Sequence, residues 1–361
     1  MKRLRAWIDR LGSEPFDSLV GHQFRVIVQG AHSRRHAGTL IGLEPLGRLA
    51  PRPGDATPKS ALLLRFLDSP GSGLESGLIA NELGALLTLV SGCRIEVATE
   101  LALSAPPSPG TYFMAIGGDQ TVDGPISDSA FAVFSDYLSR LSSLDPDDLA
   151  ALAAAADLHY GAVILAEQDK RAAYVLLVAG LEVLSRRFGA PPSDWSDWEL
   201  ACNWEALFNR TSLSPPQAQA IRDHLMKDRQ LRLAATFREY ASQSLPNSFW
   251  DSSLVTHSYA VHLPQGTRDQ LISDTRDMET LVPRDRHVLG QALSKTYALR
   301  SGVMHRGQEV ALFQIGVKSG MPISSDQPLP FSVLRLTLAA LIRHELERLS
   351  HPSPLPDIQT A

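Results

Sequence analysis

The segment Leu299–Gly307, "LRSGVMHRG", places an arginine and a histidine close together after an apolar-periodic stretch of the chain. Arg300 is permanently cationic, and its guanidinium fork matches the oxygens of a phosphate group. His305 titrates near neutrality, so it can accept or donate a proton. Together these groups suit the attack of an RNA 2′-hydroxyl on the adjacent phosphate, a reaction that needs charge stabilisation and proton transfer but no metal ion.

The spacing of Arg300 and His305 limits how the two side chains can cooperate. Residues five positions apart on an ideal helix lie about 140° apart around its axis, so the pair does not share one face. Gly302 and Gly307 would allow the helix to unwind or to end here. We therefore expect the two side chains to converge only if the backbone leaves the regular helix, or if both line a wide cleft. The alternative is that both residues have ordinary structural roles at a helix end.

The composition of the whole chain sets bounds on its class. The chain has 361 residues, of which 44% are apolar and 20% are charged, with a formal net charge of -5. This length predicts two domains, and the charge balance means that any contact with nucleic acid must come from a local patch. Cys93 and Cys202 lie far apart and fit neither a disulfide framework nor a zinc pattern. The basic N-terminus is too short and too charged for a signal peptide, and the apolar stretches fall short of a membrane span, so the sequence predicts a soluble cytoplasmic protein.

The first part of the chain, residues 1–145, is predicted to be a strand-rich mixed α/β domain. Apolar runs at 22–30 and 61–68 predict strands, and 93–103 and 110–118 are weaker candidates. Residues 74–92 have helical spacing and end at a glycine, whereas the Pro- and Gly-rich segment 45–60 predicts a loop. The domain also contains the basic cluster His32, Arg34, Arg35 and His36. We interpret that cluster as a solvated hairpin tip, with a phosphate or RNA contact as the alternative.

The second part, residues 146–350, is predicted to be a bundle of helices. Asp145, Asp147 and Asp148 together with Pro146 form a helix start signal. The predicted helical stretches are 145–167, 168–189, 214–245 in two pieces, 274–305 and 330–349. Residues 246–266 are interpreted as an irregular insertion and 351–361 as a flexible tail. The Trp-rich segment 194–208 is expected to cap the bundle, with a stacking platform for nucleic-acid bases as the alternative.

Three stretches of the second part resemble one known family. Residues 293–307, "LSKTYALRSGVMHRG", resemble the signature of the HEPN superfamily, R-x4-6-H with a polar residue after the arginine, and most closely its ApeA-like branch. Residues 172–189 resemble the first long helix of that branch, with a buried Glu182, and 232–250 resemble its middle segment. The likeness covers residues 146–350, and the first part is similar in outline to the strand-rich domain that such proteins often carry.

The resemblance implies a function and a partner. HEPN domains are helical bundles that commonly dimerise and face their motifs across a cleft, and many are metal-independent ribonucleases of toxin, antiphage and abortive-infection systems. By this resemblance His305 is the general acid or base, Arg300 the phosphate clamp and Ser301 the polar residue that orients the pair. Many active members carry Asn or another larger polar residue where Ser301 stands. Some HEPN domains are inactive, so a catalytically silent module that binds a nucleotide or a protein is the alternative function.

Three further residues are expected to support this site. Glu182 is expected to be a buried partner of Arg300, and Tyr297 is expected to pack rather than react. Arg306 is expected either to contact the RNA backbone or to remain a solvated charge favoured by the helix dipole. The sequence as a whole therefore predicts an α+β two-domain protein that needs no cofactor and no metal ion. Its expected partners are RNA, a second copy bound through the helical domain, and a regulatory or trigger protein sensed by the N-terminal domain, but no membrane.

Overall fold

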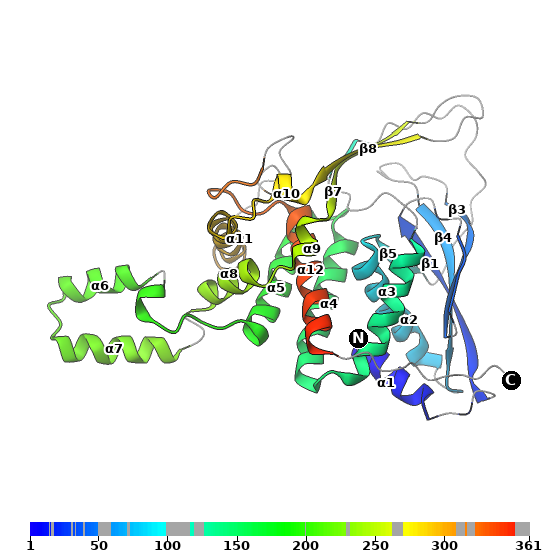
Figure 1. Cartoon of the computed structure of the whole chain (residues 1–361), viewed down its shortest axis with the longest axis horizontal. Coiled ribbons are helices and arrows are strands. Elements are labelled where there is room, and N and C mark those ends of the chain that lie inside the picture. The colour runs from blue at the N-terminus through cyan, green and yellow to red at the C-terminus, as the bar shows by residue number, and fades with distance from the viewer. Residues whose placement is uncertain are drawn as a thin grey trace.

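The protein has an α+β fold in which an antiparallel sheet stands at one end of a body of helices (Figure 1). The computed structural model describes residues 1–13, 15, 18–29, 32, 34–38, 40–49, 59–70, 73–98, 116–118, 126–198, 200–228, 232–261, 270–307, 315 and 322–350. The predicted class, strands first and helices after them, is confirmed at this level. The expected tail at 351–361 lies outside the described residues.

The N-terminal sheet has the strand order β2-β3-β4-β1-β5, and each described pair of strands is antiparallel. Its strands are β1 (Val20–Gln29), β2 (His36–Ala37), β3 (Ile41–Arg48), β4 (Lys59–Asp68) and β5 (Ile95–Ala98). The strands predicted at 22–30 and 61–68 are confirmed. Part of the loop predicted at 45–60 is wrong, because β3 continues to Arg48. The register shifts between Pro45 and Gly47, and such a bulge lets a strand accommodate these two residues.

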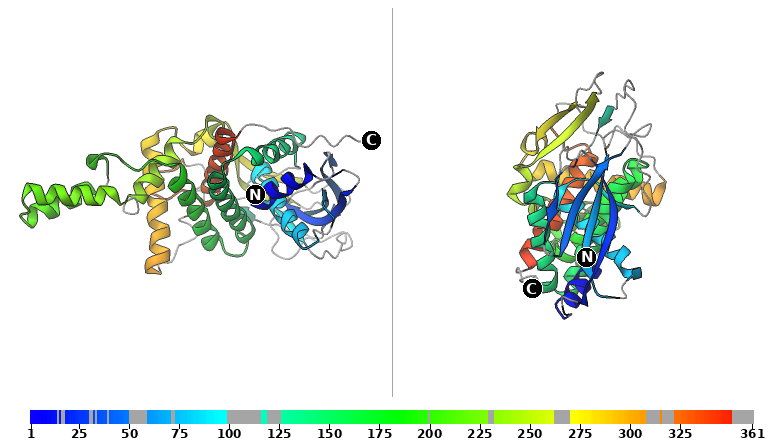
Figure 2. Two further views of the ribbon diagram at one scale, coloured as in Figure 1. Left: turned by 90° about the horizontal axis from the view of Figure 1, so that it is seen from below. Right: turned by 90° about the vertical axis from the view of Figure 1, so that its right-hand side faces the viewer.

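Three helices cover the inner face of this sheet, between the strands and the bundle (Figure 2). They are α1 (Lys2–Leu11), α2 (Gly73–Ser91) and α3 (Asp128–Arg140). The fully buried Trp7 of α1 packs edge-on against Phe66 of β4, with 5.8 Å between ring centroids. The helix predicted at 74–92 is confirmed as α2, and Gly92 after it has a φ of 72°. Alternate residues of β4 face these helices, so the other face of the sheet is left to solvent.

The second part of the chain is organised around one central helix, which contacts four others. The central helix is α5 (Lys170–Phe188), and its neighbours are α4 (Pro146–Leu165), α8 (Leu233–Gln243), α11 (Arg286–Arg306) and α12 (Phe331–Leu349). Asp145 caps α4 by accepting the Asp147 amide at 2.9 Å, as its start signal predicts. Gly180 allows α5 to approach α12, since a Cβ there would lie 2.6 Å from Leu338. The helices predicted at 145–167, 168–189, 214–245 in two pieces, and 330–349 are confirmed.

The Trp-rich segment does not cap the bundle as expected. It contributes a short 3₁₀ turn (Trp195–Asp197) and α6 (Ala201–Arg210), which with α7 (Pro215–Lys227) forms an arm that projects from the body (Figure 1). A separate small cluster of Trp198, Leu225 and Ala235 lies at the base of this arm. The reason is that its tryptophans pack against each other and against α7 residues, and Ala235 at the start of α8 is the one buried bundle residue in their cluster.

The insertion expected to be irregular contains regular strands. After α9 (Asn247–Trp250), β7 (Ser253–Val261) forms a hairpin with β8 (Gln270–Asp277), which leads into α10 (Met278–Leu281). The start of the helix predicted at 274–305 is therefore wrong, because residues 274–277 belong to β8. The strand β6 (Ile116–Gly118) pairs with β7, so a segment of the first part completes a sheet of the second.

The two parts share their buried core. One cluster of buried apolar residues runs from the N-terminal sheet through α2 and α4 into α5 and α12. The division expected between residues 145 and 146 stays a prediction. Among the described helices, α4 alone is long and apolar enough to cross a membrane by length and composition, whereas the apolar stretches were expected to fall short of a membrane span. It packs against α2, α5 and α12, as a core helix of a soluble protein does.

Candidate functional site

The helix α11 carries the arginine–histidine pair on its last two turns. Asp285 caps its start by accepting the His287 amide at 2.8 Å, and the helix continues without a break to Arg306. Gly307 then adopts the left-handed conformation, with a φ of 61°, and its amide donates to the Gly302 carbonyl. Unwinding at Gly302 therefore does not occur, because that residue is buried inside a regular helix. Arg300 and His305 keep the separation of about 140° that an ideal helix gives them.

Arg300 faces the interior and is held by α5. Its Nη2 donates to Oε2 of Glu182 at 3.1 Å, with side-chain exposures of 19% for Arg300 and 7% for Glu182. The expected partnership between these residues is confirmed. The other carboxylate oxygen of Glu182 and Nε of Arg300 are buried and have no hydrogen-bond partner in the structure. The pair is thus incompletely satisfied, and a polar ligand that reached it would find a donor and an acceptor there.

Burial dominates the electrostatics of this pair. It raises the pKa of Glu182, although the charges of Arg300, Arg186 and His305 act in the opposite direction. Three basic groups are therefore close enough to this one carboxylate to influence its titration. Arg186 was not among the predicted site residues, and its position one helical turn after Glu182 is the signal that could have identified it. The surplus of positive charge makes the end of α11 suited to a phosphate.

His305 lies on the outside of the helix. His305 is exposed, and so are its neighbours Arg306 and Met304. The exposed fraction of Met304 is 56%. Within the described part of the chain, His305 makes no hydrogen bond or ion pair, so its ring nitrogens are accessible to a substrate. Ser301 is half-buried beside Arg300. The structure therefore places the three predicted catalytic residues on one helix end but does not bring Arg300 and His305 onto one face.

The remaining predicted residues lie around this site. Tyr297 is half-buried and packs against Phe237 of α8, with 5.4 Å between ring centroids, which agrees with its expected packing role. Thr296 was missed by sequence analysis. Its buried hydroxyl accepts the Leu329 amide at 2.9 Å and the Tyr174 hydroxyl at 3.4 Å. These bonds tie α11 to α5 and to the segment before α12, so they fix the helix that carries the site.

The basic cluster of the N-terminal part is not simply a solvated hairpin tip. Nδ1 of the buried His32 accepts the Ile126 amide at 3.0 Å, and Nδ1 of the buried His36 lies 3.1 Å from Asp128. Both histidines therefore anchor the start of α3. Arg34 and Arg35 are exposed, and each is paired with a carboxylate.

Comparison of the chain with protein-family models, curated proteins and solved structures finds no match. Fold and site together define the class only as an α+β protein with an arginine–histidine pair at a helix end. Among the residues that the structure describes, no group of three or more His, Cys, Asp or Glu side chains is placed to hold a metal ion.

Proposed function

We propose that the protein is a metal-independent endoribonuclease of the HEPN type, acting in the cytoplasm in antiphage, abortive-infection or toxin defence. One observation carries this proposal: Arg300 is fixed by Glu182 while His305 stands exposed five residues further along the same helix. An anchored phosphate-binding group and an accessible proton-transfer group are what cleavage through the RNA 2′-hydroxyl requires.

Arg300 is the group that binds the scissile phosphate. A guanidinium has five N–H donors, and Glu182 takes one of them at Nη2, which leaves donors for phosphate oxygens. Because Glu182 is buried on α5, it fixes the direction of the fork without blocking the exposed part of the side chain. Holding the cation in place before substrate arrives reduces the reorganisation needed in the transition state.

His305 moves the proton. The 2′-oxygen attacks phosphorus as its proton leaves, and the bond to the 5′-oxygen breaks as that oxygen gains a proton. The products are a 2′,3′-cyclic phosphate and a 5′-hydroxyl. These two transfers need a base and an acid, whereas one chain brings one such histidine at this site. We therefore propose that two chains pair through the helical part and that each supplies one His305, next to the exposed apolar side chain of Met304.

The test is RNA cleavage by the full-length protein in EDTA. We expect fragments that end in 2′,3′-cyclic phosphate, and no fragments from a His305→Ala variant purified in parallel. Cleavage that requires added Mg²⁺, or fragments with 3′-hydroxyl ends, would show that the mechanism is wrong. Light scattering at micromolar concentration tests the pairing of chains, and a monomer would count against it.

A silent module that binds a nucleotide or a protein is the second candidate. The observation that favours it is the unbroken helix, which keeps Arg300 and His305 on different faces of α11. In that case RNA or a nucleotide binds without being cleaved, and Arg300→Ala weakens binding while His305→Ala leaves it unchanged. In either case we propose that the N-terminal part senses a trigger protein or restrains the helical part.

A further inference from the structure

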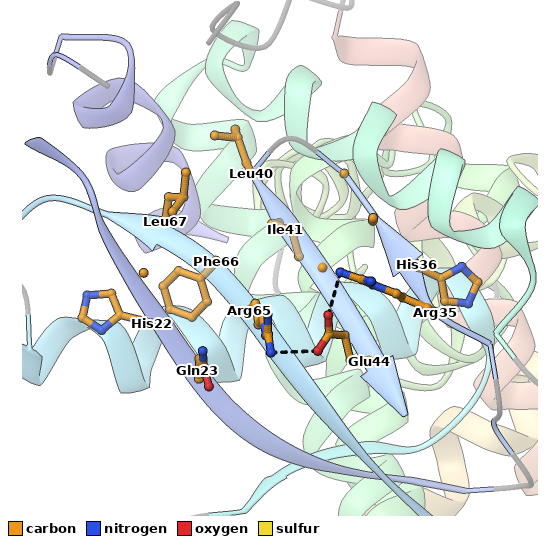
Figure 3. Close-up of a pocket in the computed structure, with 14 residues that line it drawn as sticks. His22, Gln23, Arg35, His36, Leu40, Ile41, Glu44, Arg65, Phe66 and Leu67 are labelled. Atoms are coloured by element: carbon orange, nitrogen blue, oxygen red, sulfur yellow. Dashed lines mark ion pairs between the residues drawn. The ribbon is translucent and has the colours of Figure 1, made fainter. Parts of the chain in front are cut away.

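A second site lies on the outer face of the N-terminal sheet, at the side of the body away from α11 (Figures 1 and 3). A hollow of about 350 Å³ opens there over β1, β2, β3 and β4. None of the residues of the proposed RNA site contributes to its lining. The proposed RNA site therefore does not account for the hollow.

Small residues make the floor of this hollow. In the register of the sheet, Gly42 pairs with Ala37 on one side and with Arg65 on the other, and Gly21 pairs with Leu67. A Cβ at Gly21 would meet nothing within 4 Å, and one at Gly42 would meet only the His36 carbonyl oxygen at 3.5 Å. Neither crowding nor a positive φ requires glycine at these two positions. What the glycines supply is open space above the strands.

Two arginines converge on one carboxylate at the wall of the hollow. Nη2 of Arg35 lies 2.8 Å from Oε1 of Glu44, and Nη2 of Arg65 lies 2.8 Å from Oε2 (Figure 3). Arg35 immediately precedes β2, and Arg65 reaches Glu44 diagonally from β4. The arginine side chains are 69% and 46% exposed, and each contacts Glu44 through Nη2, so other N–H donors remain for a ligand.

The charges favour an anion. Two guanidinium groups and one carboxylate leave a surplus of one positive charge at the wall. His36, which also lines the hollow, directs Nδ1 at Asp128 and stacks on Phe131. Because Glu44 occupies one side of each guanidinium fork, it holds both forks in place for a second acceptor. A phosphate, with oxygens on several sides, can accept from both.

We propose that this hollow binds the phosphate group of a small phosphorylated ligand, with the rest of the ligand lying over Gly21 and Gly42. The volume is at the lower end of the range of roughly 300–1,000 Å³ that is typical of small-molecule sites, so it suits a single nucleotide or a similar phosphate ester. The apolar side chain of Leu67 beside the floor offers a surface for the part that carries no charge. This site is independent of the proposed RNA cleavage.

Calorimetric titration of the full-length protein tests the proposal. The probes are inorganic phosphate, 5′-AMP and adenosine, the last being a matched ligand without the phosphate. Arg65→Gln removes one guanidinium, and Gly42→Leu fills the floor without changing any charge. Arg25→Gln is the control, because Arg25 is an exposed arginine of the same sheet face that does not line the hollow. Thermal melts establish that each variant is folded, and Gly21→Leu is the second filling variant.

We expect 5′-AMP to bind and adenosine to bind at least about tenfold more weakly, the factor expected for one charge-assisted hydrogen bond. Arg65→Gln and Gly42→Leu weaken 5′-AMP binding by at least about tenfold, and Arg25→Gln changes it by less than about twofold. Adenosine binding as tightly as 5′-AMP would overturn the proposal. So would undiminished binding by both filling variants, or binding of an RNA oligonucleotide but of neither small phosphate. RNA cleavage by Arg65→Gln at the parental rate would confirm that the two sites are separate.

Discussion

The end of α11 and the hollow of the N-terminal sheet use the same chemistry in opposite environments. At α11, Arg300 and Glu182 are mostly removed from water, with side-chain exposures of 19% and 7%. In the hollow, Arg35 and Arg65 are 69% and 46% exposed and share Glu44. Burial raises the pKa of Glu182 despite its cationic neighbours, so the carboxylate loses more by leaving water than it gains from them.

Because of this difference, removing one partner of an ion pair should affect stability differently in the two regions. A buried pair contributes little net stability, but removing one partner leaves an uncompensated charge in the interior. An exposed pair is screened by solvent, and its removal costs little. The buried pair at α11 is therefore costly to disturb, whereas the exposed pairs of the hollow are not. Four predictions test this difference.

The largest expected effect is on activity. His305→Ala should reduce RNA cleavage by about 10²–10⁴-fold, because it removes a positioned proton-transfer group. The side chain is exposed, so the free energy of unfolding should change by no more than about 0.5 kcal/mol. Arg300→Ala is the paired variant, and it should lose both activity and stability because Glu182 is left buried and unpaired. A folded His305→Ala protein that cleaves at the parental rate would favour the silent binding module.

The second prediction concerns the shared core between the first and second parts of the chain. His159 of α4 is buried with neither ring nitrogen hydrogen-bonded, and burial followed by the charges of Arg335 and Arg343 lowers its pKa to about 3. The unfolded chain therefore binds a proton at His159 below pH 6.5, whereas the folded protein does not until about pH 3. Stability that is fully present above pH 6.5 should fall as the pH decreases through this window, by up to several kcal/mol, at about 1.4 kcal/mol for each pH unit.

Chemical unfolding at pH 7 and pH 5 measures this effect, with His159→Leu as the variant without the titrating ring. The difference between the two pH values should be smaller in the variant. Because Arg335 donates to the Gly92 carbonyl beside α2, the site of His159 is formed by both parts of the chain. Separate unfolding transitions of the two parts would contradict the shared core.

Local signals in the sequence were sufficient for the long helices of the second part and for the buried pair. The acidic cap at Asp145 and the glycine after α5 mark boundaries that the structure confirms. Glu182 on an otherwise apolar helix required a cationic partner, and Arg300 proved to be that partner. Such features depend on a few neighbouring residues or on one unpaired charge, which is why they can be read from the chain.

Features that depend on distant segments could not be predicted. Nothing within residues 253–261 indicates that β7 pairs with 116–118, and the Trp-rich segment gave no sign that its aromatic side chains would pack on α7. The convergence of Arg35 and Arg65 on Glu44 depends on the register of three strands. The identity of the charged residues was visible in the sequence, but the register that brings them together was not.

The third prediction tests the buried pair. Glu182→Ala should lower the free energy of unfolding by about 2–3 kcal/mol, less than for a fully buried pair because Arg300 still reaches water in part. The double variant Glu182→Leu and Arg300→Met should recover most of that loss, because it removes both charges and keeps apolar volume. Urea unfolding at neutral pH measures both. A double variant no more stable than Glu182→Ala would show that the cost comes from packing and not from an unpaired charge.

The smallest effect is expected from the equivalent change in the hollow. Glu44→Ala removes the partner of two arginines, yet both guanidinium groups already contact water, so each lost pair should cost no more than about 1 kcal/mol. That cost should decrease further in 0.5 M NaCl, since salt screens exposed pairs, whereas the loss in Glu182→Ala should change little. Urea unfolding at low and high salt compares the two directly. If Glu44→Ala were as destabilising as Glu182→Ala and insensitive to salt, the hollow would be covered in solution, and its arginines would not be accessible to a phosphate.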